Sequence, residues 1–556
     1  MNIVVIGASA AGLKAACRAR RLMPDAKVKV IEKGKYISYS ACGLPYFLAG
    51  DVDSFRELNT TAYDVVKDPD YFLHTKDVEV LTETVAEHIE ADKKVLHCYN
   101  LIEGESFRLK YDKLVIATGA DPVIPPINGA DLPGVCTFTT AEDAIELRKA
   151  LQTGQIGKAA IIGAGFIGCE LTEAFTAMWG VETVLFEMLD QPLSKMLDPE
   201  MAGIVMKEFE RNEIETHFGS AIKTIDGAGE TLKIITSDGE YEGFDRVIIA
   251  AGVKPSVKLA ETAGIETGSL GGIKVNEKMR TSVPAIYAAG DCVEAEHILT
   301  GKSCHLPLGS LANRMGRVAG NNLADNDDVF EPVVGSSCLK IFDLSIAAAG
   351  LSFTGAKNAG FDPGESWGVF TDRVHYYPDS ELLTAKLVFD RCTKQVLGVQ
   401  AVGKADVIRR VDAVSSMIKA CVTLEQVMNF EPAYAPPYAN ALDPLHFLAY
   451  AGIAGLEEGI QSFNPGELIE RAVETVVLDV RESIEIEEMP FPHECEQLIT
   501  IPLTKIRARL NEIPQDTKIS VVCQRGTRSS EVVRILQEHG WQDVAYLGGG
   551  LGFYLD

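Results

Sequence analysis

Short apolar runs that end in glycine turns recur along the chain. "NIVVIGASAAG" and "KAAIIGAGFIGCE" each place four apolar residues before a glycine-rich turn, and a helix-forming stretch follows. A short apolar run bounded by glycine is typical of a buried parallel strand. The pattern therefore predicts two strand–turn–helix units, each part of an α/β sheet.

Both turns have the spacing of a dinucleotide fingerprint. Such a turn brings backbone N–H groups to a helix N-terminus, where the helix dipole favours the negative charge of a pyrophosphate. One such turn could join any strand to any helix, but two complete copies indicate a protein that binds two dinucleotides. The fingerprint positions are Gly7, Ser9 and Gly12 in the first copy and Gly163, Gly165 and Gly168 in the second.

A carboxylate closes the next strand after each turn. Glu32 ends "VKVIE" and Glu187 ends "TVLFE", at nearly the same offset from the two turns. A carboxylate at this place binds ribose hydroxyls. At Glu187 it would accept from a 2′-hydroxyl and repel a 2′-phosphate, which favours NADH over NADPH in the second site.

Three further strand ends fit the same plan. "YDKLVIATGA" carries Thr118 and Gly119, "FDRVIIAAGVKP" carries Gly252, and "SVPAIYAAGDC" carries Asp291. In this order the motifs resemble those of the FAD- and NAD(P)H-dependent pyridine nucleotide–disulfide oxidoreductases, over about residues 1–445. In that family the aspartate of the "GD" motif binds the flavin ribityl chain.

The resemblance implies FAD and NADH as cofactors. The residues it assigns to them are Gly7, Ser9, Ala10, Ala11, Gly12, Glu32, Lys33, Thr118, Gly119, Gly163, Gly165, Phe166, Ile167, Gly168, Glu187, Gly252 and Asp291. No metal site is expected.

The expected fold class is α/β, with two Rossmann-like domains, an α+β dimerisation domain and a C-terminal α/β domain. The FAD domain is expected in two segments, with the NAD domain inserted between them. The expected ranges are 1–112 and 245–325 for FAD, 113–244 for NAD with flanking segments, 326–448 for dimerisation, 449–465 for a linker and 466–556 for the last domain.

Composition narrows the functional class. A chain of 556 residues is too long for one core, and its net charge of −27 is spread along the sequence. Such an acidic chain is unsuited to nucleic acid or to anionic membranes. "HFLAYAGIAGL" is too short to span a bilayer, and the first residues lack the regions of a signal peptide, so we expect a cytoplasmic protein. The twelve scattered cysteines suggest free thiols, one or two of them reactive.

Cys42 in "SACGLPY" is the first of these reactive thiols. Dithiol members of the resembled family carry Cys-x4-Cys beside the flavin, but here Phe47 stands in the second place. A lone thiol there can cycle through a sulfenate or through a mixed disulfide. Single-cysteine NADH oxidases and peroxidases carry a histidine in the first glycine loop, where this chain has Ala10. The second sulfur is therefore expected from the substrate, and the chain resembles coenzyme A-disulfide reductases.

A basic helix face agrees with this resemblance. Lys14, Arg18 and Arg21 stand at i, i+4 and i+7, on one side of the first helix. By spacing alone, a solvated face is an equal interpretation. In the resembled reductases this helix meets the phosphates of coenzyme A, and Ser38 and Ala41 flank its pantetheine arm.

Two tyrosines are expected to assist the thiol. "EPAYAPPYANALDP" resembles a segment that a partner subunit places over the flavin, which implies a homodimer, and it carries Tyr438 where oxidases tend to have Phe. A phenol can donate a proton to a leaving thiolate. A second tyrosine in "VHYYPDS" is Tyr377 or its neighbour Tyr376. Each could instead be an aromatic packed at the dimer interface.

A second thiol lies near the C-terminus. "KISVVCQRGTRSSEVVRIL" predicts strand, loop and helix, with Cys523 opening the loop and the helix starting near Ser529. Converging N–H groups in such a loop lower a thiol pKa and hold an anion. The loop residues are Gln524, Arg525, Gly526, Thr527 and Arg528.

The flanking motifs "VVLDVRES", with Asp479 and Arg481, and "YLGGG" resemble those of a rhodanese domain, which carries sulfur as a cysteine persulfide. "HECEQLITIPL" departs from the pattern, because a Gly-Ala pair is missing, so this loop is expected to be remodelled. A phosphatase of the same fold and an inert structural domain are the alternatives.

The expected activity is NADH-dependent reduction of coenzyme A disulfide, persulfide or polysulfide through FAD and Cys42. Coenzyme A is expected as bound substrate or as a mixed disulfide on Cys42, and small thiols and persulfides as partners. The rhodanese cysteine would handle sulfane sulfur. An oxygen-reducing NADH oxidase and a protein that is mainly a sulfurtransferase are the alternatives.

Overall fold

The computed structural model describes residues 1–554. The chain forms two compact units. The first joins Met1–Pro192 to Ile214–Val333, and the second joins Leu193–Glu213 to the chain from Val334 onward. The mixed α/β class predicted from the sequence is confirmed, since both units contain parallel or antiparallel sheets covered by helices.

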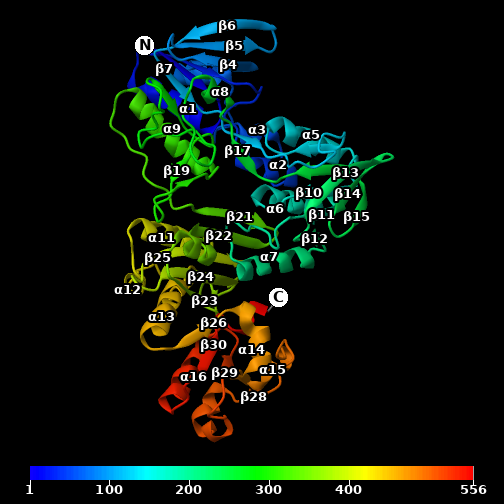
Figure 1. Cartoon of the computed structure of the whole chain (residues 1–556), viewed down its shortest axis with the longest axis vertical. Coiled ribbons are helices and arrows are strands. Elements are labelled where there is room, and N and C mark those ends of the chain that lie inside the picture. Colours follow the sequence, from blue (N-terminus) through cyan, green and yellow to red (C-terminus); the bar gives the residue numbers. More distant parts are fainter. Residues whose placement is uncertain (555–556) are drawn as a thin grey trace. The chain divides into compact units, whose positions relative to one another are not determined.

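The first unit contains a parallel sheet whose central strand, β1, leads into the first glycine turn. Its strand order is β18-β7-β1-β2-β3. These strands are β1 (Asn2–Ile6), β2 (Lys27–Ile31), β3 (Glu79–Leu81), β7 (Lys113–Ile116) and β18 (Ile286–Ala288). Helix α1 (Ala10–Leu22) lies beside α9 (Gly309–Leu323), as Figure 1 shows. A Cβ atom at Gly316 would lie 2.3 Å from the Ala11 carbonyl oxygen, so only glycine permits this close crossing.

A second parallel sheet repeats this plan within the same unit. Its order is β12-β11-β10-β16-β9, with the second glycine turn after the central strand β10. Its elements are β9 (Val135–Thr137), α5 (Ala141–Gln152), β10 (Lys158–Ile162), α6 (Phe166–Glu173), β11 (Glu182–Phe186), β12 (Glu215–His217) and β16 (Arg246–Ile249). Helix α6 continues into a π-helical turn, Ala174–Met178.

Each parallel sheet has an antiparallel three-stranded sheet in its connection. These are β4 (Thr84–Glu90), β5 (Val95–Asn100) and β6 (Glu105–Lys110), and β13 (Ile222–Ala228), β14 (Thr231–Thr236) and β15 (Glu240–Phe244). Strand β8 (Ala120–Pro122) pairs with β17 (Val253–Pro255) where the chain passes between the two parallel sheets. The shorter elements are α2 (Leu44–Ala49), α3 (Phe55–Leu58), α4 (Pro69–Lys76), α8 (Lys258–Thr262), β19 (Ala295–Glu296) and β20 (Ser303–Cys304).

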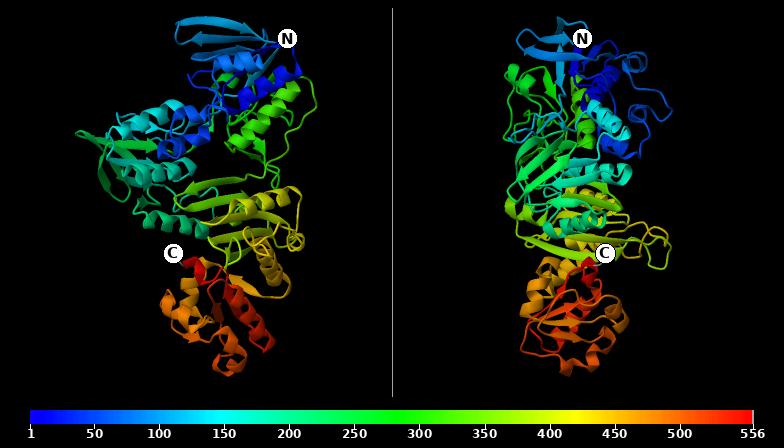
Figure 2. Two further views of the ribbon diagram at one scale, coloured as in Figure 1. Left: turned by 180° about the vertical axis from the view of Figure 1, so that it is seen from behind. Right: turned by 90° about the vertical axis from the view of Figure 1, so that its right-hand side faces the viewer.

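The second unit begins with an antiparallel sheet of order β21-β22-β25-β24-β23. Two long loops, 372–381 and 431–442, project from one side of this part of the unit (Figure 2). The elements are α7 (Pro199–Arg211), β21 (Ser337–Ile341), β22 (Leu344–Gly350), α10 (Phe353–Ala359), β23 (Pro363–Thr371), β24 (Leu382–Asp390), β25 (Val396–Gly403), α11 (Ile408–Lys419), α12 (Leu424–Val427) and α13 (Pro444–Glu457).

Helix α7 is held to this sheet by a buried ion pair. Lys386 of β24 is 1% exposed, and its ammonium lies 2.9 Å from Asp198 Oδ2 and 2.7 Å from Glu365 Oε2. Asp198, which precedes α7, also accepts a hydrogen bond from Gln400 Nε2 at 2.7 Å. A buried charge is stable only when it is paired and hydrogen-bonded, so this network fixes α7 on the sheet.

The C-terminal part of the second unit is a five-stranded parallel sheet of order β26-β30-β29-β27-β28. Helices α14 and α16 lie on opposite sides of it (Figure 1). The elements are β26 (Gln461–Phe463), α14 (Leu468–Glu474), β27 (Val476–Asp479), α15 (Ser483–Glu488), β28 (Leu498–Thr500), β29 (Ile519–Val522), α16 (Thr527–Glu538) and β30 (Val544–Leu547). Helix α16 begins at Thr527, two residues before the start expected near Ser529.

The expected connector, 449–465, contains regular structure. Helix α13 extends to Glu457, because its apolar residues pack inward and Gly452 lies against Leu424 and Phe389. Strand β26 then pairs in parallel with β30, at the edge of the C-terminal sheet. The apolar run "HFLAYAGIAGL" is therefore part of a packed helix.

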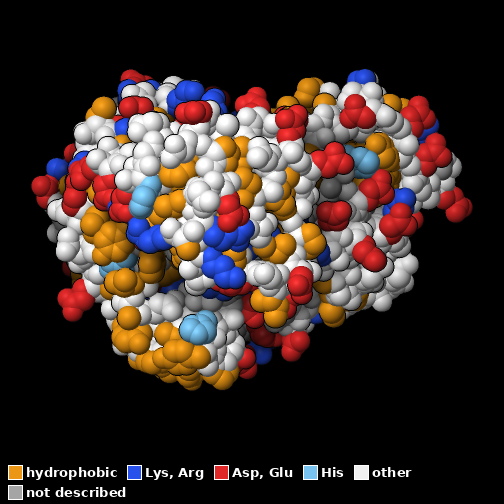
Figure 3. Space-filling model, turned by 90° about the horizontal axis from the view of Figure 1, so that it is seen from below, with side chains coloured by type: hydrophobic (Ala, Val, Ile, Leu, Met, Phe, Trp, Pro, Cys, Tyr) orange, Lys and Arg blue, Asp and Glu red, His pale blue; other side chains and the backbone are white. Residues whose placement is uncertain are grey.

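Acidic side chains are scattered over the face in Figure 3 rather than gathered into one patch. Within residues 1–554, no helix is both long enough and apolar enough to cross a membrane. The described part of the chain also contains no cluster of three His, Cys, Asp or Glu residues arranged for a metal ion. All twelve cysteines are free thiols.

Candidate functional site

The two glycine turns have the same local geometry. Gly7 has φ +105° and Gly163 has φ +106°, a region that other residues rarely adopt. A Cβ atom at Gly12 would lie 1.9 Å from the Gly7 carbonyl oxygen, and one at Gly168 would lie 1.8 Å from the Gly163 carbonyl oxygen. Each helix therefore starts directly against its strand end, and its first N–H groups face the place where a pyrophosphate binds.

The two strand-end carboxylates are also held alike. Glu32 accepts hydrogen bonds from the backbone N–H of Ala8 at 2.6 Å and of Gly34 at 2.9 Å. Glu187 accepts from the N–H of Ala164 at 2.8 Å and of Leu189 at 2.9 Å. In both copies the carboxylate is fixed beside the glycine turn, where it can meet a ribose. Lys33, next to Glu32, is exposed.

The other expected cofactor residues lie at strand ends or in first helical turns. Thr118 Oγ1 donates to the Ser256 carbonyl oxygen at 2.6 Å, which joins the two passages of chain between the parallel sheets. Asp291 follows β18, and burial raises the pKa of its carboxyl group. Ser9, Ala10 and Ala11 form the start of α1, Phe166 and Ile167 start α6, Gly165 precedes it, and Gly119 and Gly252 have φ +69° and +101°.

Cys42 lies in space next to the first residue of α9. It occupies a short 3₁₀ turn, Ala41–Gly43, and is exposed. A Cβ atom at Gly309, the first residue of α9, would lie 3.6 Å from Cys42 Sγ. Desolvation by the surrounding protein raises the pKa of the Cys42 thiol, and the carboxylates of Glu170 and Asp291 raise it further, while the Gly309 N–H opposes them. Phe47, in the place of a second thiol, is buried.

Glu170 is a titratable group near Cys42 that the sequence interpretation missed. It lies on α6, and Tyr46 Oη donates to its Oε1 at 3.2 Å. Burial raises the pKa of Glu170 to about 7, and the Tyr46 hydrogen bond opposes this shift. The only signal in the sequence is a carboxylate two residues after the third glycine of the second turn.

The three basic residues of α1 differ in exposure. Lys14 and Arg21 are exposed, whereas Arg18 is half-buried and donates from Nε to Asn321 Oδ1 on α9. Arg18 therefore also serves helix packing. Ser38, which has φ +53°, accepts a hydrogen bond from Lys67 Nζ at 2.8 Å, and Ala41 is exposed.

The expected tyrosines lie in the two projecting loops of the second unit. Tyr438 is 69% exposed in loop 431–442, and Tyr376 and Tyr377 are 68% and 36% exposed in loop 372–381. Asn440 Nδ2 donates to the Thr371 carbonyl oxygen at 2.9 Å, so the bases of the two loops are in contact.

Cys523 has a different environment. It is fully buried at the end of β29, and its Sγ accepts from the N–H groups of Gly526 at 3.2 Å and Ser529 at 3.4 Å. The Ser529 hydroxyl lies 3.3 Å from the same sulfur. Gly526 has φ +85°, which turns the loop around the thiol. Gln524 is half-buried, and Arg525 and Thr527 are exposed.

The last loop arginine is paired with a carboxylate that the sequence interpretation missed. Arg528 donates from both terminal nitrogens to Glu485 of α15, each at 2.6 Å. This hydrogen bonding lowers the pKa of Glu485 and raises that of Arg528. Asp479 and Arg481 form a separate pair at 2.7 Å and are both buried, and Arg481 also donates to the Met489 carbonyl oxygen at 2.8 Å.

These features define a class of protein, with two dinucleotide sites and a thiol beside them. The chain belongs to the pyridine nucleotide–disulphide oxidoreductase family, whose model matches residues 1–316, and the family's dimerisation-domain model matches residues 336–445. FAD and NAD(P)H are the cofactors of this family, and the two turns described above fit them.

Three similar proteins have informative names. A "NAD(P)H sulfur oxidoreductase (CoA-dependent)" of Pyrococcus furiosus is 37% identical, covering 81% of this chain and 98% of its own. A "NADH oxidase" of Methanocaldococcus jannaschii is 36% identical, with the same shares covered. A solved structure described as a NAD-dependent persulfide reductase from A. fulgidus is 40% identical, with a TM-score of 0.95 and full coverage of both chains.

Proposed function

We propose that the protein is an FAD-dependent NADH reductase of coenzyme A disulfide, coenzyme A persulfide and polysulfide sulfur. The observation that carries the proposal is the lone, exposed Cys42 at the start of α9, with Phe47 in place of a second thiol. Because the chain offers no local partner sulfur, the disulfide formed during turnover must include a sulfur of the substrate.

The chemistry at Cys42 is thiol–disulfide exchange. The thiolate attacks one sulfur of the substrate, the S–S bond breaks, and coenzyme A leaves as a thiolate that takes up a proton. FAD and NADH, when bound, supply the two electrons that reduce the resulting mixed disulfide. The net reactions are NADH + H⁺ + CoA–S–S–CoA → NAD⁺ + 2 CoA–SH and NADH + H⁺ + CoA–S–SH → NAD⁺ + CoA–SH + H₂S.

Two kinds of side chain can supply the proton that the leaving coenzyme A thiolate takes up. Tyr438, and Tyr377 or Tyr376, are proposed to donate to the leaving thiolate from a partner subunit in a homodimer. Their exposure in projecting loops supports this, because exposed aromatic side chains favour contact with a second chain. Glu170 has a pKa of about 7 and can exchange a proton at neutral pH. Lys14, Arg18 and Arg21 are proposed to bind the phosphates of coenzyme A, with Ser38 and Ala41 along its pantetheine arm.

The domain boundaries predicted from the sequence belong to this proposal. The sequence assigned 1–112 and 245–325 to FAD, and 113–244 with flanking segments to NADH. Because β7 (Lys113–Ile116) lies in the first parallel sheet and β16 (Arg246–Ile249) in the second, each of these two boundaries is moved to follow the strand. Residues 326–448 would form the dimer. The cytoplasmic location is also retained as a proposal.

The C-terminal residues 466–556 are proposed to form a rhodanese domain in which Cys523 carries sulfane sulfur. Support comes from the N–H groups of Gly526 and Ser529 that donate to Sγ, since these two donors would stabilise the anion of a persulfide. The full-length similarity to a protein described as a persulfide reductase agrees with a sulfur role for the whole chain.

An NADH oxidase is the second candidate, because one similar protein carries that name. The first glycine loop has Ala10 where a proton-transfer histidine would be expected, and this favours the sulfur reaction.

One experiment separates the two candidates. NADH consumption is followed with coenzyme A disulfide or coenzyme A persulfide under nitrogen, and with oxygen alone. We expect rapid consumption with the sulfur substrates and slow consumption with oxygen. A faster oxygen reaction, with hydrogen peroxide or water as its product, would overturn the proposal.

A further inference from the structure

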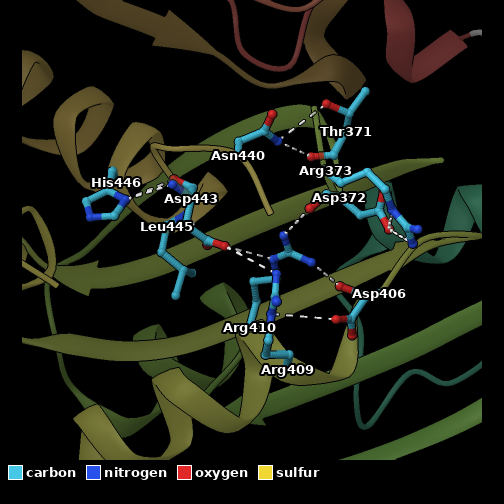
Figure 4. Close-up of polar contacts among 10 residues, drawn as sticks. All are labelled: Thr371, Asp372, Arg373, Asp406, Arg409, Arg410, Asn440, Asp443, Leu445 and His446. Atoms are coloured by element: carbon cyan, nitrogen blue, oxygen red, sulfur yellow. Dashed lines mark hydrogen bonds and ion pairs between the residues drawn. The ribbon is translucent and has the colours of Figure 1, made fainter. Parts of the chain in front are cut away.

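The two projecting loops that carry the tyrosines share one buried cation, Arg410. This residue lies on α11 and is 2% exposed. Its side chain ends between the bases of loops 372–381 and 431–442, as Figure 4 shows. Neither loop contains Arg410, so the contacts are between segments far apart in sequence.

Each nitrogen of the guanidinium has its own acceptor. Nε donates to Asp443 Oδ2 at 3.1 Å, beside the end of the Tyr438 loop. Nη2 donates to the Asp372 carbonyl oxygen at 2.7 Å, at the first residue of the other loop. Nη1 donates to the Asp406 carbonyl oxygen in the turn before α11. A guanidinium holds its donors in a fixed plane, so it also fixes the three acceptors relative to one another.

Further contacts close both loops at the same place. The Asp372 carboxylate accepts from Arg373 at 2.7 Å and from the Glu381 N–H at 3.2 Å, which joins the two ends of the first loop. Asn440 donates to the Thr371 carbonyl oxygen at 2.9 Å, across to the second loop. His446 contacts the Phe430 carbonyl oxygen at 2.7 Å, where the second loop begins.

These contacts leave the loop tips free but fix their bases. Tyr376 and Tyr438, at 68% and 69% exposed, have little burial of their own to hold them, and Tyr377 is 36% exposed. A buried arginine that loses one acceptor is left with an unsatisfied charge, which is costly, so a shift of either base is opposed by the contacts of the other.

We propose that Arg410 is a positioning residue that holds the Tyr376–Tyr377 loop and the Tyr438 segment as one unit, with Asn440 as the direct link between them. The inference rests on the proposed function in one respect, that these tyrosines donate protons to the leaving thiolate. Arg410 does not itself touch the substrate in this proposal.

The positioning is tested by ¹⁹F NMR on the full-length protein with 3-fluorotyrosine at position 377 or 438. Asn440→Ala and Arg410→Lys should shift or broaden both resonances, although neither change alters a tyrosine. Glu425→Gln, which removes the carboxylate that Lys394 contacts at 2.6 Å elsewhere in the same domain, is the matched control. Loops that respond independently, with the Tyr377 resonance unmoved by Asn440→Ala, would overturn the proposal whatever the enzyme's substrate.

The catalytic consequence is tested by a double-mutant cycle. Asn440→Ala should lower kcat for coenzyme A disulfide about tenfold, with KM nearly unchanged, because misplaced catalytic groups slow the reaction step. In a Tyr438→Phe background the same change should cost less than about twofold. An equal loss in both backgrounds would mean a purely structural role. A wild-type protein that does not reduce coenzyme A disulfide or persulfide would instead refute the proposed function, and the NMR result would still decide the positioning.

Discussion

Cys42 and Cys523 are both free thiols at the start of a helix, but their surroundings are opposite. Cys42 is exposed, and its thiol pKa is raised by desolvation from the neighbouring protein and then by the carboxylates of Glu170 and Asp291. Cys523 is fully buried and receives hydrogen bonds from Gly526 and Ser529. One thiol is open to a large substrate, and the other is enclosed by donors.

This difference indicates a division of labour. An exposed thiol with acidic neighbours spends most of its time protonated and becomes a thiolate when a substrate or cofactor changes its field. An enclosed sulfur that accepts from two N–H groups is suited to carry the anion of a persulfide. The proposed function gives electron-dependent reduction to Cys42 and sulfur storage to Cys523, and the following predictions test that contrast.

Replacing Cys42 should give the largest effect. Cys42→Ser should lower NADH-dependent reduction of every disulfide and persulfide by at least about 10³-fold, because it removes the nucleophile. The variant should still bind FAD and accept electrons from NADH, as its absorbance spectrum would show. Retention of most activity would mean that another group reduces the substrate directly.

Cys523→Ser should affect sulfur transfer rather than disulfide reduction. Sulfur transfer from thiosulfate or a persulfide should fall by about 10³-fold, whereas reduction of coenzyme A disulfide should stay within about twofold of wild type. Reduction of inorganic polysulfide should weaken as well. The measurements are sulfur transfer to cyanide and NADH oxidation, made on the same preparation. Equal losses in both would point to a folding role for the C-terminal domain.

Glu485→Gln should sharpen the contrast at Cys523. Glutamine keeps one acceptor oxygen but carries no charge, so Arg528 loses one of its two hydrogen bonds and its neutralising partner, and KM for the dianion thiosulfate should fall about three- to tenfold. Glu487→Gln on the same helix removes the same charge from an exposed position and serves as the control. A KM that is unchanged, or equally changed in both variants, would show that the Arg528–Glu485 pair does not limit anion binding.

Glu170→Gln should give the smallest effect, at Cys42. Removing this carboxylate should lower the pKa of the Cys42 thiol, measured as a shift of the pH dependence of alkylation by iodoacetamide to lower pH. Glu182→Gln, an exposed change at the start of strand β11, should leave the Cys42 pKa unmoved.

The same variant tests a stability dependence. Folding raises the pKa of Glu170 to about 7, so its contribution to stability is complete below its ordinary value of 4.5 and is lost as pH rises through 7. The thermal unfolding temperature of the wild type should therefore fall more steeply with rising pH than that of Glu170→Gln between pH 5 and 8. Parallel curves would contradict the raised pKa.

The parts of the fold that were predictable depend on local rules. Gly7, Gly12, Gly163 and Gly168 could be placed because a close strand–helix turn admits no Cβ atom, and this requirement is visible in the sequence. Glu32 and Glu187 followed from their offset to the turns. Cys42 and Cys523 were found from their motifs.

The parts that were missed arise from contacts between distant segments. Glu170 meets Tyr46 across 124 positions, Glu485 meets Arg528 across 43, and Arg410 meets Asp443 across 33. The local pattern of apolar and polar residues carries no information about contacts between such distant residues. The regular structure within 449–465 was missed for a related reason, because Gly452 of α13 packs closely against Leu424 and Phe389, which lie earlier in the sequence.

Helix α7 cannot pack until a much later part of the chain has been synthesised. Its buried residues Met201, Val205 and Phe209 leave the ribosome long before Lys386 and the sheet that will cover them. At about 5–20 residues per second, this helix waits for many seconds with an uncovered apolar face. A nascent chain stopped before β24 would therefore be a natural client for a chaperone, although its first two sheets are already complete.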